Sequence, residues 1–267
     1  RRGYRISPRW KSPADLQASA ITIDPVYTSG RQGCLSRLRM YETPEGRKLP
    51  SVTTILSRSN PRWESLENWK ERQIALLGED GFKQQQQETL TSGTIVHSLI
   101  QHYLTPPPDQ RAPPILDNEY SDRVQCLWES VEPVLEDVSD VDVIESAVHH
   151  SSLEYAGTID CIATYKGEKR IIDWKTSRRK KYRIEDTFDN PIQLAAYLGA
   201  LYTDVRYPET ARPTSGMIVV IYEDEPASTF TLTKDELEGY WQEWLKRYTD
   251  FQHVLKHGAL PANPLSS

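Results

Sequence analysis

The sequence predicts a mixed β-sheet with helices on both faces, preceded by a mainly helical region. Two observations indicate this α/β class. Apolar residues recur at helical spacing up to about residue 136, whereas strand-like runs and two more helices occupy 141–257. One of those helices joins the third strand-like run to a later one, as the crossover between parallel strands requires. We expect one domain over 49–257, divided into a helical part (49–136) and an α/β core (141–257), between an irregular basic arm (1–48) and a tail (258–267).

The helical part is expected to contain four helices. Prolines and glycines interrupt any regular period before Leu49, so helix formation is expected to begin after it. Ser51 is placed to cap the first, short helix, which runs to Leu56. The longer helices carry apolar residues near every third or fourth position, and they span Arg62–Leu77, Thr94–Leu104 and Glu119–Leu135.

The α/β core is expected to order its elements as three strands, a helix, two strands and a final helix. The first three strands form a meander of hairpins and cover Val141–His149, Tyr155–Tyr165 and Lys169–Lys175. The next helix takes Asn190 as its cap and Pro191 at its first position, and it runs to about Tyr202. A capping box of Thr233 and Glu236 opens the final helix. The two remaining strands lie between these helices, at Ser215–Tyr222 and Ser228–Leu232.

Composition excludes several classes of protein. Of the 267 residues 37% are hydrophobic, and 7 Trp and 14 Tyr supply bulky core side chains, which is typical of a folded chain and not of a disordered one. No apolar stretch approaches the roughly 20 residues of a membrane-spanning helix, so we expect no membrane association. Three cysteines without a CxxC pair exclude a disulfide framework and a four-thiolate cluster, and they are Cys34, Cys126 and Cys161. The net charge of -6 argues against a protein that coats duplex nucleic acid, although it leaves room for a local basic channel.

Two acids and a lysine occur together on neighbouring strands of the core. Asp173 and Lys175 alternate with Trp174 on one strand, so both charged side chains point the same way. That triplet alone is also typical of a surface ion pair. Asp160 lies on the preceding strand, and the hairpin between the strands brings it beside Asp173. Two adjacent carboxylates repel each other, and a divalent cation with oxygen ligands makes such a pair tolerable; the alternative is that one acid faces solvent.

Two further pairs of residues have the spacing of one helical turn. Gly93 and His97 form the first pair, and a neutral imidazole is a candidate third metal ligand. Gln193 and Tyr197 form the second, and an amide and a phenol aimed at a carboxylate pair suit the binding of a phosphodiester. Each of these residues alone is more often an ordinary core or surface residue.

In this order the motifs resemble the RecB-like branch of the PD-(D/E)XK nucleases, and most closely its mitochondrial exonucleases. The motifs are Gly93-xxx-His97, Gly157-xx-Asp160, Asp173-x-Lys175 and Gln193-xxx-Tyr197. Segments that are similar to those exonucleases are Leu49–Thr53, Gly78–Lys83, Glu145–Val148, Ile172–Ser177 and Thr187–Pro191. Each motif is weak, but the ordered combination is specific, and it covers about Leu49–Tyr248.

The resemblance implies metal-dependent cleavage of single-stranded DNA or DNA flaps from a free end, by a monomer in the mitochondrial matrix. It implies that Mg²⁺ or Mn²⁺ is held by His97, Asp160, Asp173 and the backbone carbonyl of Trp174. Lys175 would orient or activate the attacking water, and Gln193 and Tyr197 would complete the catalytic site. The helical part would arch over the site, so that single strands thread through it. The family's iron-sulfur members use four cysteines around the core, so the three scattered here exclude a cluster.

A basic run follows the acid-x-lysine motif and is the candidate nucleic-acid contact. Its five cations and one aromatic residue suit a rail for the DNA backbone with a base-stacking platform, and they are Arg178, Arg179, Lys180, Lys181, Tyr182 and Arg183. The alternative is a solvated loop. The acid-free start from Arg1 to Lys11 fits either the end of a removed organellar targeting segment or a trimmed chain.

Two rival functions stay open from the sequence. One is a structure-selective duplex endonuclease of the same superfamily. The other is a nuclease fold kept as a non-catalytic nucleic-acid-binding module, which would have no need of two mutually repelling carboxylates.

Overall fold

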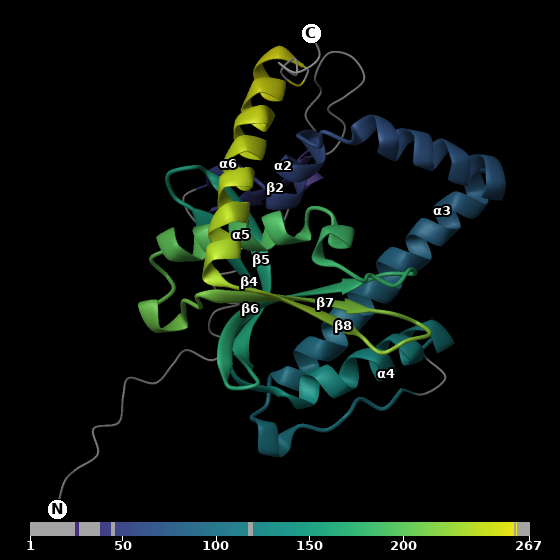
Figure 1. The fold of residues 1–267 in the computed structure, drawn as a ribbon, viewed down its shortest axis with the longest axis vertical. Coiled ribbons are helices and arrows are strands. Elements are labelled where there is room, and N and C mark those ends of the chain that lie inside the picture. The colour runs from purple at the N-terminus through teal and green to yellow at the C-terminus, as the bar shows by residue number, and fades with distance from the viewer. Residues whose placement is uncertain (1–24, 27–37, 44–45, 117–119, 259, 261–267) are drawn as a thin grey trace, which may run out of the picture.

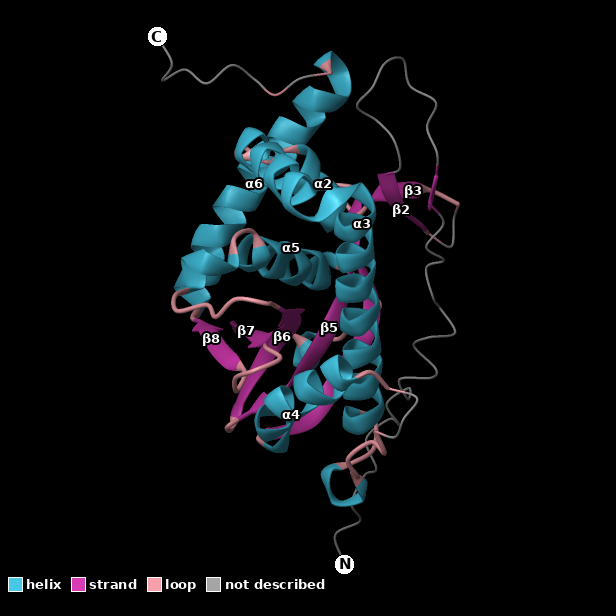
Figure 2. Ribbon diagram, turned by 90° about the vertical axis from the view of Figure 1, so that its right-hand side faces the viewer, coloured by secondary structure: helices cyan, strands magenta, loops and turns pink. Residues whose placement is uncertain are grey.

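A mixed five-stranded β-sheet forms the centre of the molecule (Figures 1 and 2). The computed structural model describes residues 25–26, 38–43, 46–116, 120–258 and 260. The strands lie in chain order across the sheet, as β4 (Val138–His150), β5 (Tyr155–Tyr165), β6 (Glu168–Thr176), β7 (Ser215–Ile221) and β8 (Ser228–Leu232). Neighbours are antiparallel except for β6 and β7, which are parallel and are connected through the helix α5 (Asn190–Thr203). This is the mixed sheet that the sequence predicted.

Helices cover both faces of the sheet and enclose two hydrophobic cores (Figure 2). One core lies under α2 (Val52–Arg58), α5 and α6 (Lys234–His257). The other lies under α4 (Asp122–Glu136) and the second half of α3 (Trp63–Leu104). Successive side chains of a strand point to opposite faces of the sheet, so Ile171 of β6 packs in the first core and Ile172 packs in the second. The predicted α/β class is confirmed.

The helix α3 is bent at Gly78, whose φ of 72° and ψ of 164° lie outside the helical range. The first half projects away from the sheet, and the second half returns along it towards α4 (Figure 1). The predicted end of the first helix at Leu77 matches the bend, but the prediction that the next helix begins at Thr94 is wrong, because it begins at the bend. Residues 79–93 are mostly exposed and lack an apolar period, yet they are rich in the helix formers Gln, Glu and Lys.

A small antiparallel sheet precedes the helices and corrects the expectation of an irregular arm before residue 49. Its strands lie in chain order and are β1 (Pro25–Val26), β2 (Leu38–Glu42) and β3 (Lys48–Pro50). Gly46 lies in the turn between β2 and β3 with a φ of 77°, which glycine adopts without strain. This glycine, which was taken from the sequence as a sign of irregular backbone, is therefore part of a β-hairpin. Tyr41 of β2 is buried, and its hydroxyl lies 2.9 Å from Thr158 Oγ1 on β5. The basic stretch from Arg1 to Lys11 lies outside the described residues.

The helix caps match the sequence prediction at two of three places. Ser51 accepts a hydrogen bond from the Thr54 N–H at the start of α2, and the predicted capping box of Thr233 and Glu236 opens α6. The cap of α5 is Asp189 and not Asn190. A tight turn just before α5 shifts the start of the helix by one residue. Within the described residues, no helix has the length and apolar character to cross a membrane.

Candidate active site

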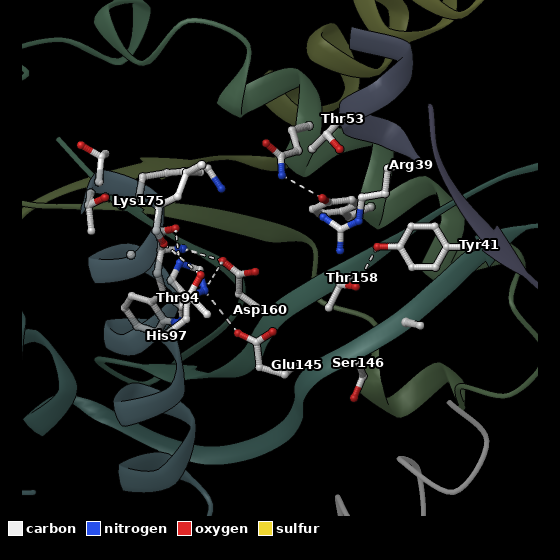
Figure 3. A pocket seen from close by; sticks show the side chains of 18 residues that line it. Arg39, Tyr41, Thr53, Thr94, His97, Glu145, Ser146, Thr158, Asp160 and Lys175 are labelled. Carbon is white, nitrogen blue, oxygen red and sulfur yellow. Dashed lines mark hydrogen bonds and ion pairs between the residues drawn. The ribbon is translucent and has the colours of Figure 1, made fainter. Parts of the chain in front are cut away.

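A cleft of about 800 Å³ lies where α3 passes the sheet opposite the N-terminal hairpin (Figure 3). The α3 wall includes Gly93 and His97, and the sheet contributes Glu145, Asp160 and Lys175. The remaining wall comes from β2, α2 and α5. Segments that are far apart in the sequence therefore supply one concave surface, which is the usual form of a ligand site.

Asp160 and Asp173 lie next to each other where β5 and β6 separate. The ladder between the strands ends at the pair Cys161 and Ile172, so the next pair along is Asp160 and Asp173. Beyond it the carboxylate of Asp160 replaces the strand partner, because its Oδ2 accepts the Trp174 N–H at 2.9 Å. The hairpin thus brings the two acids together, as the sequence predicted.

Burial raises the pKa of both carboxyl groups. Asp173 is 1% exposed, and its pKa rises to about 6, mainly through burial and further through the charge of Asp160, while Lys175 acts against the rise. The pKa of Asp160 is also raised by burial, with Glu145 adding to the shift against Lys175 and His97. Two neighbouring buried carboxyl groups are costly to ionise together, so this position would favour a bound cation.

Lys175 is paired with Asp173 on the same strand. Its Nζ lies 2.6 Å from each carboxylate oxygen, but only Oδ1 accepts an aligned hydrogen bond. The buried Oδ2 of Asp173 has no hydrogen-bond donor. Burial acts against the charge of Lys175, yet Asp173 and Asp160 outweigh it and raise the pKa, so the amine is charged at neutral pH.

His97 points from α3 at the acids and at the backbone of β6 (Figure 3). Its Nε2 lies 3.0 Å from the Trp174 carbonyl oxygen, which can only accept, so Nε2 carries the hydrogen. Nδ1 therefore faces the carboxylates, 3.3 Å from Glu145 Oε1 and 3.8 Å from Asp160 Oδ2. A nitrogen lone pair in that position is repelled unless a proton or a metal cation lies between the groups. Burial opposes the charged ring, but the hydrogen bond to Glu145 and the charges of Asp160 and Glu145 prevail and raise the pKa of His97.

Glu145 is the site residue to which sequence reasoning gave no role. It lies on β4 between the partners of Ile159 and Cys161, which places it opposite Asp160. Its φ of 41° is unusual for a residue with a side chain, and such strain is typical of functional sites. Ligand atoms of His97, Glu145 and Asp160 all lie within 4.8 Å of one another. The sequence signal that could have identified Glu145 is an acidic residue in the middle of a largely buried strand.

The donor set fits a divalent cation. One imidazole nitrogen and two carboxylates, with the unsatisfied Oδ2 of Asp173 nearby, are ligands that Mg²⁺ and Mn²⁺ accept. The predicted set of His97, Asp160 and Asp173 is thus brought together, although the compact group contains Glu145 in place of Asp173. The Trp174 carbonyl adjoins the group and is engaged by His97.

Gln193 and Tyr197 lie side by side on α5 and face the same cleft. The Gln193 Nε2 donates to the Tyr197 hydroxyl at 2.8 Å. Burial, followed by the charge of Asp173, raises the pKa of Tyr197 well above its usual value, so the phenol stays protonated. The two residues form a fixed polar wall and offer hydrogen-bond donors rather than a base.

A comparison with protein families identifies the superfamily to which this site belongs. The sequence profile described as the PD-(D/E)XK nuclease superfamily matches residues 68–266, about three quarters of the chain. The chain belongs to the PD-(D/E)XK nuclease superfamily. This membership confirms the resemblance that the motifs indicated, and members of this superfamily depend on divalent metal ions.

The chain is also similar to curated proteins that share one name. The chain is 36% identical to "Mitochondrial genome maintenance exonuclease 1" of Mus musculus over 217 residues, which are 80% of this chain and 62% of the relative. The proteins of the same name from Homo sapiens and Xenopus tropicalis are 37% and 38% identical, over 78% and 76% of this chain and 60% and 57% of theirs. The chain therefore spans about three fifths of the length of the relatives that it matches.

The side of the cleft opposite α3 contains three residues to which sequence reasoning gave no role. Arg39 and Tyr41 of β2 and Thr53 of α2 line the side opposite α3 (Figure 3). Arg39 and Tyr41 were missed because the segment before residue 49 carried no periodic signal, whereas Thr53 was included only as part of the segment Leu49–Thr53. Arg39 is the only cation of the cleft besides Lys175 among the described lining residues, so it extends the positive charge away from the acidic cluster.

The basic run of the chain lies outside the cleft lining, and part of its charge is neutralised by ion pairs. Lys180 pairs with Glu225 at 2.7 Å, and Arg183 lies 3.6 Å from Asp186. Tyr182 is 81% exposed, which leaves its ring free for contact. Whether this run binds nucleic acid stays a prediction, and the pairing of Lys180 lowers the charge that it can offer.

Proposed function

We propose that the protein is a divalent-metal-dependent nuclease that hydrolyses single-stranded DNA, flaps included, from free ends during maintenance of mitochondrial DNA. The observation that carries the proposal is the convergence of His97, Glu145 and Asp160 beside the charged pair of Asp173 and Lys175 in one cleft. The names of the curated relatives support the exonuclease activity and the mitochondrial setting.

The metal would be held by His97, Glu145 and Asp160, with Asp173 and the Trp174 carbonyl completing the set. A bound Mg²⁺ or Mn²⁺ polarises the scissile phosphate and lowers the pKa of a bound water. The imidazole ligand favours Mn²⁺ as the better acceptor of nitrogen. The cation would be stabilised here because Asp160 and Asp173 are buried, and burial makes their negative charge costly without a positive partner. Their raised pKa values reflect this cost.

Lys175 acts as a charge and not as a base. The pairing with Asp173 holds the amine protonated and fixes its direction into the cleft. There the ammonium offsets the charge that develops on the phosphoryl oxygens. Gln193 and Tyr197 supply neutral donors on the facing side, so they orient the phosphodiester without competing for the metal.

The preference for single strands and free ends is supported by the walls of the cleft. The second half of α3 with His97 forms one side and the hairpin with Arg39 and Tyr41 forms the other, which favours a single strand over a duplex (Figure 3). The net charge of -6 also fits a narrow track better than a broad duplex-binding surface. We further propose a monomer in the mitochondrial matrix.

A comparison of linear and closed-circular single-stranded DNA tests the proposal. Linear DNA labelled at either end is incubated with Mg²⁺, Mn²⁺ or chelator, in parallel with a circle of the same sequence. We expect metal-dependent loss of the linear DNA and an intact circle. Efficient cleavage of the circle would exclude action from free ends. Cleavage of nicked or branched duplexes instead would favour the structure-selective endonuclease, and binding without cleavage in every metal would favour the non-catalytic module.

A further inference from the structure

Phe188 occupies a backbone position that glycine normally takes. It follows η2 (Ile184–Thr187) and has a φ of 60° and a ψ of -119°, and Asp189 follows at -86° and 2°. These angles are those of the two central residues of a type II′ turn, whose first position is dominated by glycine. A side chain there is strained, and strained backbone in a native protein is concentrated at functional sites.

The strained side chain is also exposed. Phe188 is 63% exposed, so its ring contributes little to the hydrophobic core. Folding therefore gains little from phenylalanine here, while the backbone bears the strain. A partner for the ring outside the folded chain would account for both features.

Two cations lie against this ring. The Arg62 guanidinium is 5.5 Å from the ring centroid, and the Lys181 ammonium is 4.8 Å from it. Arg62 is only loosely paired, with Asp189 at 3.7 Å and more than half of its side chain exposed. Within the described residues, Lys181 has no carboxylate partner. An exposed aromatic ring with two accessible cations is the combination that binds single-stranded nucleic acid, because the ring stacks on a base while the cations meet the phosphates.

The position of Phe188 connects this feature to the cleft. The residue directly precedes α5, and the Gln193 N–H donates to the Asp189 carbonyl at 2.8 Å in the first turn of that helix. Gln193 is itself a cleft residue. Arg62 lies at the start of α3 and Lys181 in the basic run that follows β6, so both of these segments meet the start of α5 at Phe188.

We propose that Phe188 is a stacking platform for one base of single-stranded DNA outside the metal cluster, with Arg62 and Lys181 contacting the adjoining phosphates. This inference rests on the proposed function, because it names a further binding position for the same single-stranded DNA. The two cations favour a phosphate-bearing strand over an apolar protein partner.

Binding of a short fluorophore-labelled oligothymidylate, measured by anisotropy in chelator, tests the inference. Phe188→Ala and Phe188→Leu remove the ring, Phe188→Trp keeps one, and Val205→Ala changes a 94% exposed residue at the other end of α5 as the matched control. We expect Ala and Leu to weaken binding about 5- to 150-fold, and Trp and the control to bind like the unchanged protein. Thermal melting tests whether each variant is folded. If Phe188→Ala is not folded, the comparison uses Phe188→Leu.

A scan with one abasic nucleotide at successive positions identifies the base. At one position the abasic change should weaken binding of the unchanged protein and have little effect on Phe188→Leu. Affinity of Phe188→Leu equal to that of the unchanged protein would overturn the proposal, and so would a loss that is the same at every abasic position. Cleavage of linear single strands with Mn²⁺ is measured beside it. A protein that cleaves but shows no dependence on Phe188 retains the proposed function and loses only the platform, whereas one that stacks without cleaving loses the exonuclease assignment.

Discussion

The ring of Tyr197 packs directly on the backbone of Gly157. A Cβ atom at Gly157 would come within 2.2 Å of Tyr197 Cε1, a separation that real side chains do not show. The glycine of this motif thus serves a close approach between β5 and α5, and it sets the position of the Tyr197 hydroxyl beside Gln193.

Gly157→Ala should therefore displace Tyr197 and damage both stability and activity. We expect a loss of about 1–3 kcal/mol in the free energy of unfolding, measured by urea denaturation, because the site is overpacked. Cleavage of linear single-stranded DNA should fall with it. Gly239→Ala is the control: this helical glycine has no atom near a new Cβ, so stability should rise by about 1 kcal/mol. Equal stability of Gly157→Ala and the unchanged protein would mean that Tyr197 moves freely.

Glu145→Gln should weaken metal binding. The change keeps the shape of the side chain and removes one of the charges that surround the cluster of His97 and Asp160. We expect the Mn²⁺ affinity, measured by isothermal titration calorimetry, to fall about 10-fold or more. Asp142→Asn is the matched control, since Asp142 is engaged by Lys169 elsewhere on the sheet. A Glu145→Gln protein that binds Mn²⁺ normally would remove Glu145 from the ligand set.

In the metal-free protein, the contribution of Asp173 to stability should fall as the pH rises from about 4 to about 6. In that window Asp173, with a pKa of about 6, holds more protons in the folded protein than in the unfolded chain, where its pKa is near 3.8. Stability therefore falls with rising pH through this group. Asp173→Asn should remove that contribution, so urea melts at several pH values should give a shallower decline for the variant. The same slope for both proteins would show that the carboxyl group ionises freely.

The pKa of Asp204 shifts in the opposite direction to the pKa of Asp173. It is fully buried, and although burial acts to raise its pKa, its bonds with Arg206 and the His149 N–H lower it overall. Asp204 therefore contributes stability above the pKa of the unfolded chain that is lost as the pH falls. Asp204→Asn should flatten the acid side of the pH profile and leave the decline from about pH 4 to 6 in place.

The sequence could predict the parts of the fold that bury apolar residues periodically. The alternation of β4 to β6 and the apolar stripe of α6 have a physical period, so their existence and order follow from it. Residues 79–93 and Leu38–Glu42 are helix and strand without that signal, because one is mostly exposed and the other is too short. Both segments are stabilised by their surroundings in the folded protein, which a short stretch of sequence does not reveal.

The candidate site was predictable where strand register alone decides it. Asp160 and Asp173 meet because a tight hairpin fixes their register, and His97 was found through its resemblance to a motif. Glu145 depends on the separate pairing of β4 with β5 and on an irregular φ, so the sequence marks it only as an acid within an apolar strand and not as a neighbour of Asp160. Arg39 reaches the cleft only through the docking of β2, for the same reason.

Lys175→Met should abolish most cleavage and spare binding. The variant keeps the aliphatic stem and removes the ammonium that offsets charge in the transition state. We expect the single-turnover rate to fall about 10²- to 10³-fold, with affinities for Mn²⁺ and for oligothymidylate changed only a few-fold. Lys169→Met is the control, because Lys169 lies on β6 like Lys175 but pairs with Asp142 of β4 and does not line the cleft. If Lys175→Met weakened DNA binding and left the rate at saturation unchanged, Lys175 would be a binding residue only.

Phe188→Gly should make the protein more stable and bind DNA less tightly. Glycine adopts a φ of 60° and a ψ of -119° without strain, so the type II′ turn before α5 should be relieved. We expect a gain of about 1 kcal/mol in urea denaturation, reduced by the lost contacts of the ring with Arg62 and Lys181. Tyr182→Gly is the matched control, since this exposed aromatic residue lies nearby without a positive φ and should gain no stability. A Phe188→Gly protein that is less stable than the unchanged one would show that the turn carries no strain, and the case for retaining phenylalanine as a binding residue would lose its thermodynamic basis.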